Sequence, residues 1–315
     1  MSLDILVPFW GDPDLPRETV ASVRAQRNGN WLLTVVDDTY PDDSVPRWFA
    51  GIQDPRIRYV RKPVNEGITA NYRTCVSLAT QDVVVVLGCD DLLLPNYVDV
   101  VLSAHEAFPD VAVTQPGVRV IDERGKVTEP LADRVKERLV RPRACTPRVL
   151  AGERLATSLL RGDWLYWPSL AFRWDVLASI EFREGMPLIQ DLALVLDVVA
   201  SGGSLPLEPT VCFHYRPHRA SASSATLLDG TRFRGERAYF DLAAHQMGAL
   251  GWRRARRAAG LHLPSRLHAL TLLPQAVPRG VRPVGTLLRH AFGPTRAGRG
   301  AACETARRPV PRGRP

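Results

Sequence analysis

The segment VVVVLGCDDLLLP, residues 83–95, decides most of what this sequence predicts about its fold. Four consecutive β-branched valines and a leucine are typical of a strand buried on both faces of a sheet. Two adjacent carboxylates, Asp90 and Asp91, follow at the C-terminal end of this strand. Buried charge needs a cation or a hydrogen-bonded partner, and ligands of open α/β sheets bind beyond the carboxyl ends of the strands. The segment therefore predicts a platform for a divalent metal and a phosphate ligand.

Strands and helices alternate around this segment over the first 120 residues. We expect strands at LDILVPF (3–9), WLLTVVDD (31–38), RIRYVRK (56–62) and within VAVTQPGVRVI (111–121). The spacing of apolar residues predicts helices at 18–26 and 44–52, from Gly67 to about 79, and at 95–107. This order predicts an α/β protein whose mostly parallel sheet carries helices on both faces.

The second half of the chain is less regular. Residues 122–148 are charged and interrupted by prolines, which indicates an insertion or a mobile loop. Order returns with predicted helices at 150–160 and 191–200, a strand at 207–218 and an amphipathic helix at 229–250. We therefore predict a domain at 1–225, a C-terminal helical extension at 226–263 and a basic, partly disordered tail at 264–315. Beyond Pro264, prolines and glycines recur too often for us to expect a packed domain.

The net charge of +8 is unevenly distributed. Residues 252–315 contain 14 arginines and one acid, so residues 1–251 are net negative. The five cysteines are scattered and form no CxxC pair, which argues against a structural zinc site or a disulfide framework. No apolar run is long enough for a membrane span, and the N-terminus resembles a first strand instead of a signal peptide. We expect a cytoplasmic protein.

Polar residues recur where the predicted strands end. Asp38 ends the second strand, and Asn65 and Gly67 follow the third, with Asn71 one helical turn later. Together with Asp90 and Asp91, these residues make a single binding crevice at one sheet edge plausible. Each also has a structural explanation, since Asp38 can cap a turn and Asp90 and Asp91 can cap the next helix. The coincidence of all these positions favours a binding site.

Several enzyme classes lack their motifs in this chain. There is no GxxxxGK[ST] phosphate loop, no GxGxxG after a strand and no GxSxG nucleophile elbow. These absences argue against a P-loop nucleotide hydrolase, a dinucleotide-binding oxidoreductase and an α/β-hydrolase.

The order of motifs resembles that of family 2 glycosyltransferases with the GT-A fold, from about Leu3 to Ser224. DILVPFWGD is similar to the opening strand of that family, and VVDDTYPDDS to its nucleotide-binding segment. NEGITANYRTCVSLATQDVVVVLGCDDLLLP is similar to the helix and metal-binding strand that follow. WPSLAFRWDVL, the acid of LIQDLAL, and HYRPHRASAS match later motifs in the same order.

The resemblance implies a role for each matching residue. Asp38 would bind the base and ribose of a sugar nucleotide, in a pocket shaped by Pro8 and Phe9 and completed by Asn65, Gly67 and Asn71. Asp90 would ligate the metal with Asp91 beside it. Asp191 would be the general base that deprotonates the acceptor hydroxyl. Arg216 and His218 would approach the diphosphate or the metal.

The chain departs from the family at one metal position. The usual motif is Asp-x-Asp, whereas Gly88 stands here in place of the first acid. Mg²⁺ or Mn²⁺ needs only one or two protein carboxylates when a diphosphate supplies further oxygens. The resemblance therefore still implies a metal-assisted, inverting transfer from a nucleotide-sugar donor to a hydroxyl of a glycan, a lipid carrier or a small molecule.

Some interpretations stay open. Asp191 could instead cap the helix that it begins, and Trp164 and Trp167 could stack on an acceptor sugar or pack in the core. The alternative functions are a nucleotidyltransferase, or a non-catalytic protein that binds phosphates or a membrane surface through its arginine-rich tail. The tail has few aromatic residues, so nucleic acid is not favoured. Peripheral contact of 266–292 with an anionic membrane at its inner face is a further hypothesis.

Overall fold

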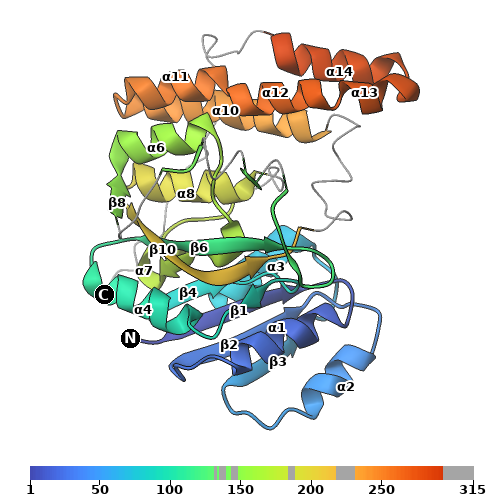
Figure 1. Ribbon diagram of the computed structural model, residues 1–315, viewed down its shortest axis with the longest axis vertical. Helices are drawn as coiled ribbons and strands as arrows, with labels where there is room; N and C mark the ends of the chain where they lie inside the picture. The colour runs from blue at the N-terminus through green and yellow to red at the C-terminus, as the bar shows by residue number, and fades with distance from the viewer. Residues whose placement is uncertain (131–132, 135–139, 143–147, 184–188, 218–230, 294–315) are drawn as a thin grey trace, which may run out of the picture.

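The computed structural model describes residues 1–130, 133–134, 140–142, 148–183, 189–217 and 231–293 of the chain. A sheet with its covering helices forms one part of the molecule, and helices from the C-terminal third form a layer beyond it (Figure 1). The predicted α/β architecture, with a mostly parallel sheet and a C-terminal helical extension, is confirmed.

The strands follow the order β3-β2-β1-β4-β9-β6-β10-β5, with β7 paired to β6 and β8 to β10. Neighbours from β3 to β4 run parallel, as do β6 and β10, whereas β9 and β5 are antiparallel to their neighbours. The bounds are β1 (Leu3–Phe9), β2 (Trp31–Asp37), β3 (Ile57–Arg61), β4 (Val83–Val86), β5 (Leu92–Leu93), β6 (Val113–Ile121), β7 (Val127–Thr128), β8 (Arg148–Ala151), β9 (Ala171–Arg173) and β10 (Ser204–Tyr215).

The valine strand is buried on both faces, as its composition predicts. Val83 and Val85 belong to a core that also contains apolar residues of α1 (Leu15–Arg24), α2 (Ser44–Ala50) and α4 (Tyr97–Ala107). Val84 and Val86 point to the opposite face and join the core under α3 (Ile68–Ser77), α6 (Gly152–Arg161) and α8 (Gln190–Ala200). Because successive side chains of a strand alternate between faces, a run of four valines anchors both helical layers.

The chain between β8 and α8 packs against the same second core. It contains α6, a short 3₁₀ helix η2 (Trp167–Ser169), β9 and α7 (Trp174–Ala178). Trp164 is fully buried and donates from its indole Nε1 to Ser158 Oγ at 3.1 Å. Trp167 is buried against Phe172 and Phe182. Both tryptophans therefore pack in the core, which settles the alternative left open by the sequence.

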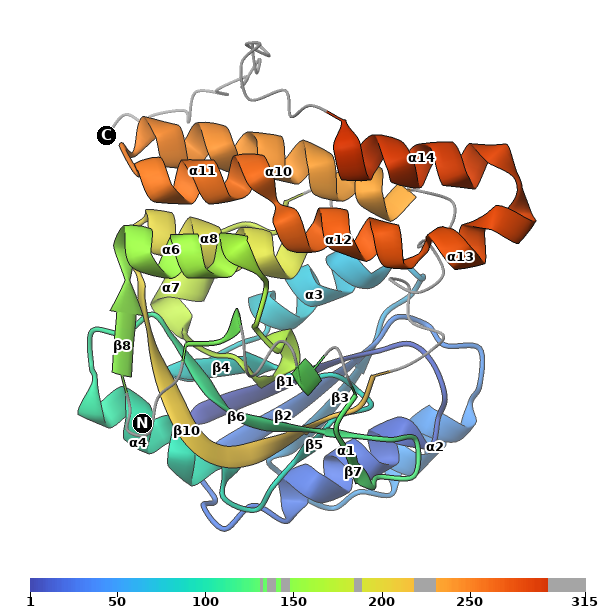
Figure 2. The same ribbon diagram turned by 45° about the horizontal axis from the view of Figure 1, so that its top comes forward.

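The C-terminal layer consists of α10 (Thr231–Ala249), α11 (Arg253–Leu261), α12 (Leu263–Thr271), α13 (Leu273–Ala276), the 3₁₀ helix η3 (Val277–Arg279) and α14 (Val281–Phe292). In both views α10 and α11 lie over α6 and α8, and α14 lies at the outer end of the layer (Figures 1 and 2). A small separate core of Phe233, Ala269, Leu272, Ala276 and Leu287 joins α12, α13 and α14 to α10.

The expectation that packing ends near Pro264 is therefore wrong for residues 264–292. The prolines that suggested an open tail stand in the first turns of helices, where the missing backbone N–H has no intrahelical partner to lose. Pro264 is the second residue of α12, Pro274 of α13 and Pro278 of η3. The predicted disorder of the last residues falls on 294–315, outside the described residues. Within the described ranges, no helix combines the length and apolar composition needed to cross a bilayer.

Two neighbouring leucines of α14 test whether this extension is packed. Leu287 is 1% exposed in the small C-terminal core, whereas Leu288 is 39% exposed. Leu287→Ala should lower the free energy of unfolding by about 2–4 kcal/mol because it leaves a cavity. Leu288→Ala should change that free energy by less than about 1 kcal/mol. Urea titration followed by circular dichroism measures both, and equal effects would show that α14 does not pack as described.

Candidate active site

Four parallel strands end at one edge of the sheet and bring the predicted site residues to that edge. Phe9 ends β1, Asp38 follows β2, the loop with Asn65 and Gly67 follows β3, and Asp90 follows β4. The Asp38 backbone N–H donates to the Phe9 carbonyl at 3.0 Å, which continues the pairing of β1 and β2 beyond their ends. These residues therefore lie along one edge of the sheet.

Asp38 organises the loop that follows β3. Its Oδ1 lies 2.8 Å from Lys62 Nζ, and both side chains are almost completely buried. The carboxylate also accepts the backbone N–H groups of Glu66 at 3.1 Å and Gly67 at 2.8 Å. Sequence reasoning did not identify Lys62, although it is one of three lysines in an arginine-rich chain. Asp38 thus fixes the conformation of the loop that follows β3.

The charge of Asp38 is set by these contacts. Burial alone would raise the pKa of Asp38, but the ammonium of Lys62 and the N–H groups of Glu66 and Gly67 outweigh burial and hold the pKa below its ordinary value. Asp38 is therefore ionised at neutral pH, and its charge is neutralised by Lys62. Glu66, half exposed, contacts the same Nζ at 2.6 Å.

The residues around the start of α3 have different surroundings. Gly67 has φ of 85°, a conformation that favours glycine, and precedes α3. Asn65 is exposed and accepts the Gly67 N–H at 3.2 Å. Asn71 is buried and donates to the Val36 carbonyl of β2 at 3.0 Å, while its Oδ1 has no hydrogen-bond partner among the described residues. Asn71 therefore ties α3 to the sheet and has one unused acceptor.

An aromatic group stands at the ends of β1 and β2. Phe9 is buried and meets Tyr40 edge to face, with ring centroids 5.5 Å apart. Trp10 meets Tyr40 from the other side at 5.7 Å and is 57% exposed. Pro8 is partly buried in the preceding position. Sequence reasoning named Pro8 and Phe9 but missed Trp10 and Tyr40, although an aromatic residue follows each strand within three positions.

The paired acids of β4 converge above Gly88. A Cβ placed on residue 88 would lie 2.6 Å from Asp90 Oδ1 and 2.5 Å from Asp91 Oδ2, so both oxygens occupy the space that any larger residue would need. The Thr19 hydroxyl of α1 fixes the loop that follows β4. It donates to the backbone carbonyls of Cys89 at 3.0 Å and Asp91 at 2.9 Å. Gly88 thus permits the two carboxylates to approach one point.

Asp91 is the buried member of this pair. Its Oδ1 accepts the backbone N–H of Arg216 at 2.8 Å, just beyond the end of β10. Burial, and then the neighbouring charge of Asp90, raise the pKa of Asp91 well above its ordinary value. The Arg216 guanidinium turns to Glu18 of α1 at 2.7 Å. His218 lies outside the described residues. The site thus gathers more negative charge than Arg216 neutralises, as a cation site requires.

Asp191 borders the same region from the second half of the chain. It lies in the first turn of α8 and accepts the Leu192 N–H at 2.8 Å. Tyr72 and Tyr215 are partly buried. Desolvation first, and then charges that include Asp191 and Asp90, raise the pKa of each of these tyrosines. The charges of Asp90 and Asp191 therefore both reach the same two side chains.

A hydrogen bond joins the first turn of α3 to α8, the helix that contains Asp191. Thr69 Oγ1, in the first turn of α3, donates to Gln190 Oε1 at 3.0 Å. Gln190 is buried directly before Asp191. The two segments, 121 residues apart in the sequence, are thus held together at the carboxyl edge of the sheet.

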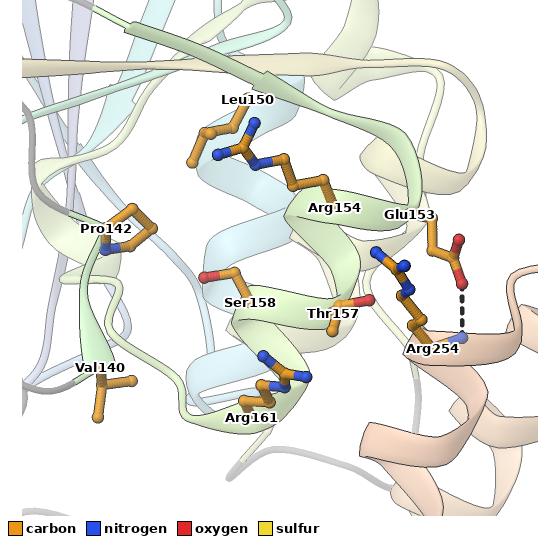
Figure 3. Close-up of a pocket in the computed structure, with 9 residues that line it drawn as sticks. All are labelled: Val140, Pro142, Leu150, Glu153, Arg154, Thr157, Ser158, Arg161 and Arg254. Atoms are coloured by element: carbon orange, nitrogen blue, oxygen red, sulfur yellow. Dashed lines mark hydrogen bonds between the residues drawn. The ribbon is translucent and has the colours of Figure 1, made fainter.

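A cavity of about 620 Å³ lies elsewhere, between α6 and α11 (Figure 3). Its polar lining includes Arg154, Arg161 and Arg254, and Glu153 accepts the Arg254 backbone N–H at 2.5 Å. It contains none of the predicted site residues. The carboxylates at the strand ends, and not this cavity, form the candidate active site.

Known proteins similar to this chain include glycosyltransferases. Residues 4–148 match the family model described as Glycosyl transferase family 2. WcaA of Escherichia coli, named as a glycosyl transferase of colanic acid biosynthesis, is 28% identical over 102 residues, covering 32% of this chain and 37% of WcaA. The succinoglycan biosynthesis protein ExoO of Rhizobium meliloti is 24% identical over 225 residues, covering 71% of this chain and 63% of ExoO. The chain spans less than two thirds of the length of either relative.

Solved structures share the whole fold at low identity. S. aureus TarS 1-349 in complex with UDP-GlcNAc superposes with a TM-score of 0.63 and 13% identity, covering 92% of this chain and 82% of that one. Mannosyltransferase PcManGT from Pyrobaculum calidifontis, in complex with GDP-Man and Mn²⁺, gives a TM-score of 0.55 at 16% identity over 91% of this chain and 78% of that one.

The fold is that of the GT-A glycosyltransferases. Residues 4–148, slightly less than half of the chain, match the model of glycosyl transferase family 2. The resemblance found in the sequence is confirmed.

The Asp38–Lys62 pair makes a prediction about stability. Asp38→Asn leaves Lys62 buried with Glu66 as its remaining partner, and should lower the free energy of unfolding by about 2–4 kcal/mol. Asp175→Asn, which breaks the exposed pair with Arg173, should change it by less than about 1 kcal/mol.

The pH dependence has a definite sign. Because folding lowers the pKa of Asp38, the contribution of its charge to the free energy of unfolding is complete above the ordinary carboxyl pKa and is lost as pH falls through the lowered value. The free energy of unfolding, measured by urea titration at a series of acidic pH values, should therefore fall less steeply with decreasing pH in Asp38→Asn than in the native protein. The same slope in both proteins would contradict this assignment.

Proposed function

We propose that this protein transfers a sugar from a nucleotide-sugar donor to a hydroxyl acceptor, with a divalent metal and inversion at the anomeric carbon. The observation that carries the proposal is the convergence of Asp90 and Asp91 above Gly88, at the strand end that also borders Asp191. The family match of residues 4–148 and the nucleotide-sugar complexes of the two solved structures support it. They do not favour the nucleotidyltransferase or the non-catalytic alternative.

The residues present fit a Mg²⁺ or Mn²⁺ ion. Asp90 Oδ1 and Asp91 Oδ2 approach one point. Burial, and then the charge of Asp90, raise the pKa of Asp91, and a bound cation would offset both effects. Among the described residues no set of three His, Cys, Asp or Glu side chains forms a metal site, so diphosphate oxygens and water would complete the coordination. His218 is the third predicted protein ligand. A bound cation supplies charge neutralisation for the departing diphosphate.

The donor would lie along the ends of β1, β2 and β3. Trp10 and Tyr40, with Pro8 and Phe9 behind them, offer flat surfaces for a base. Asp38 acts there chiefly by shaping the loop with Asn65 and Gly67, because its carboxylate is already bonded to Lys62. The unused Oδ1 of Asn71 is an acceptor for a donor hydroxyl. Arg216 holds Asp91 through its backbone and Glu18 through its side chain.

The acceptor would approach from α8. An acceptor hydroxyl has a high pKa and needs a base within hydrogen-bond reach, which is the role of Asp191. One base and direct displacement suffice for inversion, without a covalent intermediate. The names of WcaA and ExoO refer to colanic acid and succinoglycan biosynthesis, which supports a polysaccharide as the acceptor.

A release assay tests the whole proposal. Purified protein is incubated with a panel of sugar nucleotides, with Mn²⁺ or with a chelator, and free nucleoside diphosphate is measured. Slow hydrolysis of one donor, abolished by the chelator, is the expected result. Equal background release from every donor would count against the proposal.

Asp191→Asn removes the proposed base but keeps the size of the side chain. Sugar transfer should fall by at least about 100-fold, as expected for the loss of a general base. Donor affinity, measured by calorimetry, should stay nearly unchanged because Asp191 borders the acceptor side. Asp175→Asn, an exposed aspartate outside the site, serves as the control. Turnover at the native rate would remove Asp191 from the mechanism.

Asp90→Ala should act on the donor instead. It should weaken nucleoside diphosphate binding in the presence of Mn²⁺ and lower transfer by at least about 100-fold, because a metal ligand is lost. Without Mn²⁺ the variant and the native protein should bind the nucleotide similarly. The exposed Asp110→Ala is the control. If Mn²⁺ increased the affinity for nucleoside diphosphate by the same factor in Asp90→Ala and in the native protein, Asp90 would be excluded as a metal ligand.

A further inference from the structure

The C-terminal helices expose several large apolar side chains to solvent. Val281 is 87% exposed, Phe292 71% and Leu267 60%. Further exposed apolar residues in the same layer are Leu250, Leu261, Leu263, Val277 and Leu288. Such a concentration of exposed apolar residues marks an interaction surface.

On α14 these residues form one stripe. Val281, Leu288 and Phe292 are seven and four positions apart, with Gly285 between them, so they share one helix face. The opposite face of α14 buries Leu287, His290 and Ala291 against the rest of the extension. α14 therefore has two apolar faces, one packed and one exposed. Leu263 and Leu267, four positions apart on α12, form a second exposed pair.

The charge around the stripe has one sign. Residues 252–293 contain eight arginines and no aspartate or glutamate. Arg282 and Arg289 are exposed and each follows a residue of the stripe directly. A helix with an apolar face flanked by arginines lies in the plane of a membrane interface, where anionic headgroups attract the cations and the apolar side chains enter the acyl boundary.

The same charge disfavours a second copy of this chain as the partner. A two-fold contact would bring identical surfaces together and oppose arginines with arginines. The surface of an anionic bilayer instead combines negatively charged headgroups with apolar acyl chains directly beneath them. Because the opposite face of α14 is packed against the extension, only the exposed stripe can enter the lipid, and the contact would be peripheral.

We propose that this surface, defined by Val281, Leu288 and Phe292 with Arg282 and Arg289, docks the protein on an anionic lipid bilayer. In both views α14 lies at the outer end of the helical layer, away from the sheet (Figures 1 and 2). The α12–α14 part of the layer lies on the side of the molecule where α3 lies, and α3 begins at the donor-side loop. Docking through α14 would place the helical layer next to the membrane and the sheet beyond it.

Vesicle flotation of the full-length protein tests the proposal without requiring catalysis. The native protein should bind vesicles of phosphatidylcholine mixed with phosphatidylglycerol, and should bind pure phosphatidylcholine at least about tenfold less. Raising the salt concentration should weaken binding, because screening reduces the attraction of exposed charges.

Two pairs of substitutions separate the apolar and basic contributions. Val281→Ser with Phe292→Ser should lower binding to the anionic vesicles at least about tenfold, whereas Val127→Ser with Val149→Ser, also exposed, should not. Arg282→Gln with Arg289→Gln should lower it about tenfold, whereas Arg24→Gln with Arg58→Gln should not. All four residues of the test pairs are exposed, so the fold should survive, which circular dichroism verifies.

Three outcomes would overturn the proposal. These are absence of native binding to anionic vesicles, equal loss in test and control pairs, and a native dimer that the Val281→Ser and Phe292→Ser changes convert to a monomer without altering lipid binding. Diphosphate release in solution is measured on the same variants. Retained release with lost vesicle binding separates the two proposals, and so does the reverse.

Discussion

The structure of the site depends on keeping two adjacent carboxylates together in a buried loop. Burial first, and then the neighbouring charge of Asp90, raise the pKa of Asp91. The backbone N–H and the charge of Arg216 oppose this shift but do not cancel it. The Thr19 hydroxyl of α1 fixes the backbone of the same loop. A cation or a proton bound between the two carboxylates would relieve the remaining cost of the buried charge.

The order of the strands explains how distant segments reach this loop. β4 has β1 on one side and the antiparallel β9 on the other, so it is the last parallel strand of the N-terminal half. The loops after β1, β2 and β3 therefore lie on one side of the acids, and the second half of the chain, with α8, approaches from the other. The Thr69–Gln190 hydrogen bond closes the arrangement between the two halves. The proposed donor and acceptor sides would thus come from different halves of the chain and meet at the acids.

Side-chain alternation and strand ends made much of the fold predictable from the sequence. Four valines in a row predicted a strand buried on both faces, and acids after strands predicted that these side chains meet at one edge of the sheet. Partners that only folding brings together, such as Lys62 with Asp38, could not be predicted in this way. Gly88 was interpreted as a missing ligand, whereas the fold shows two carboxylates occupying the space of its absent side chain. Pro264 and Pro274 were interpreted as breaks because composition does not reveal that each stands in the first turn of a helix.

The uneven charge of the chain gains a physical meaning from the extension. Residues 1–251 are net acidic and residues 252–315 strongly basic. Near an anionic surface, residues 1–251 are repelled and residues 252–315 are attracted. The molecule is therefore turned so that its basic part faces the surface. Screening confines these forces to about 8 Å at physiological salt, so only the outermost residues sense them. The exposed side chains of α14 combine that charge with apolar area. The helical extension would then turn toward the lipid while the acidic sheet domain stays in water, an orientation that neither half of the chain could produce alone.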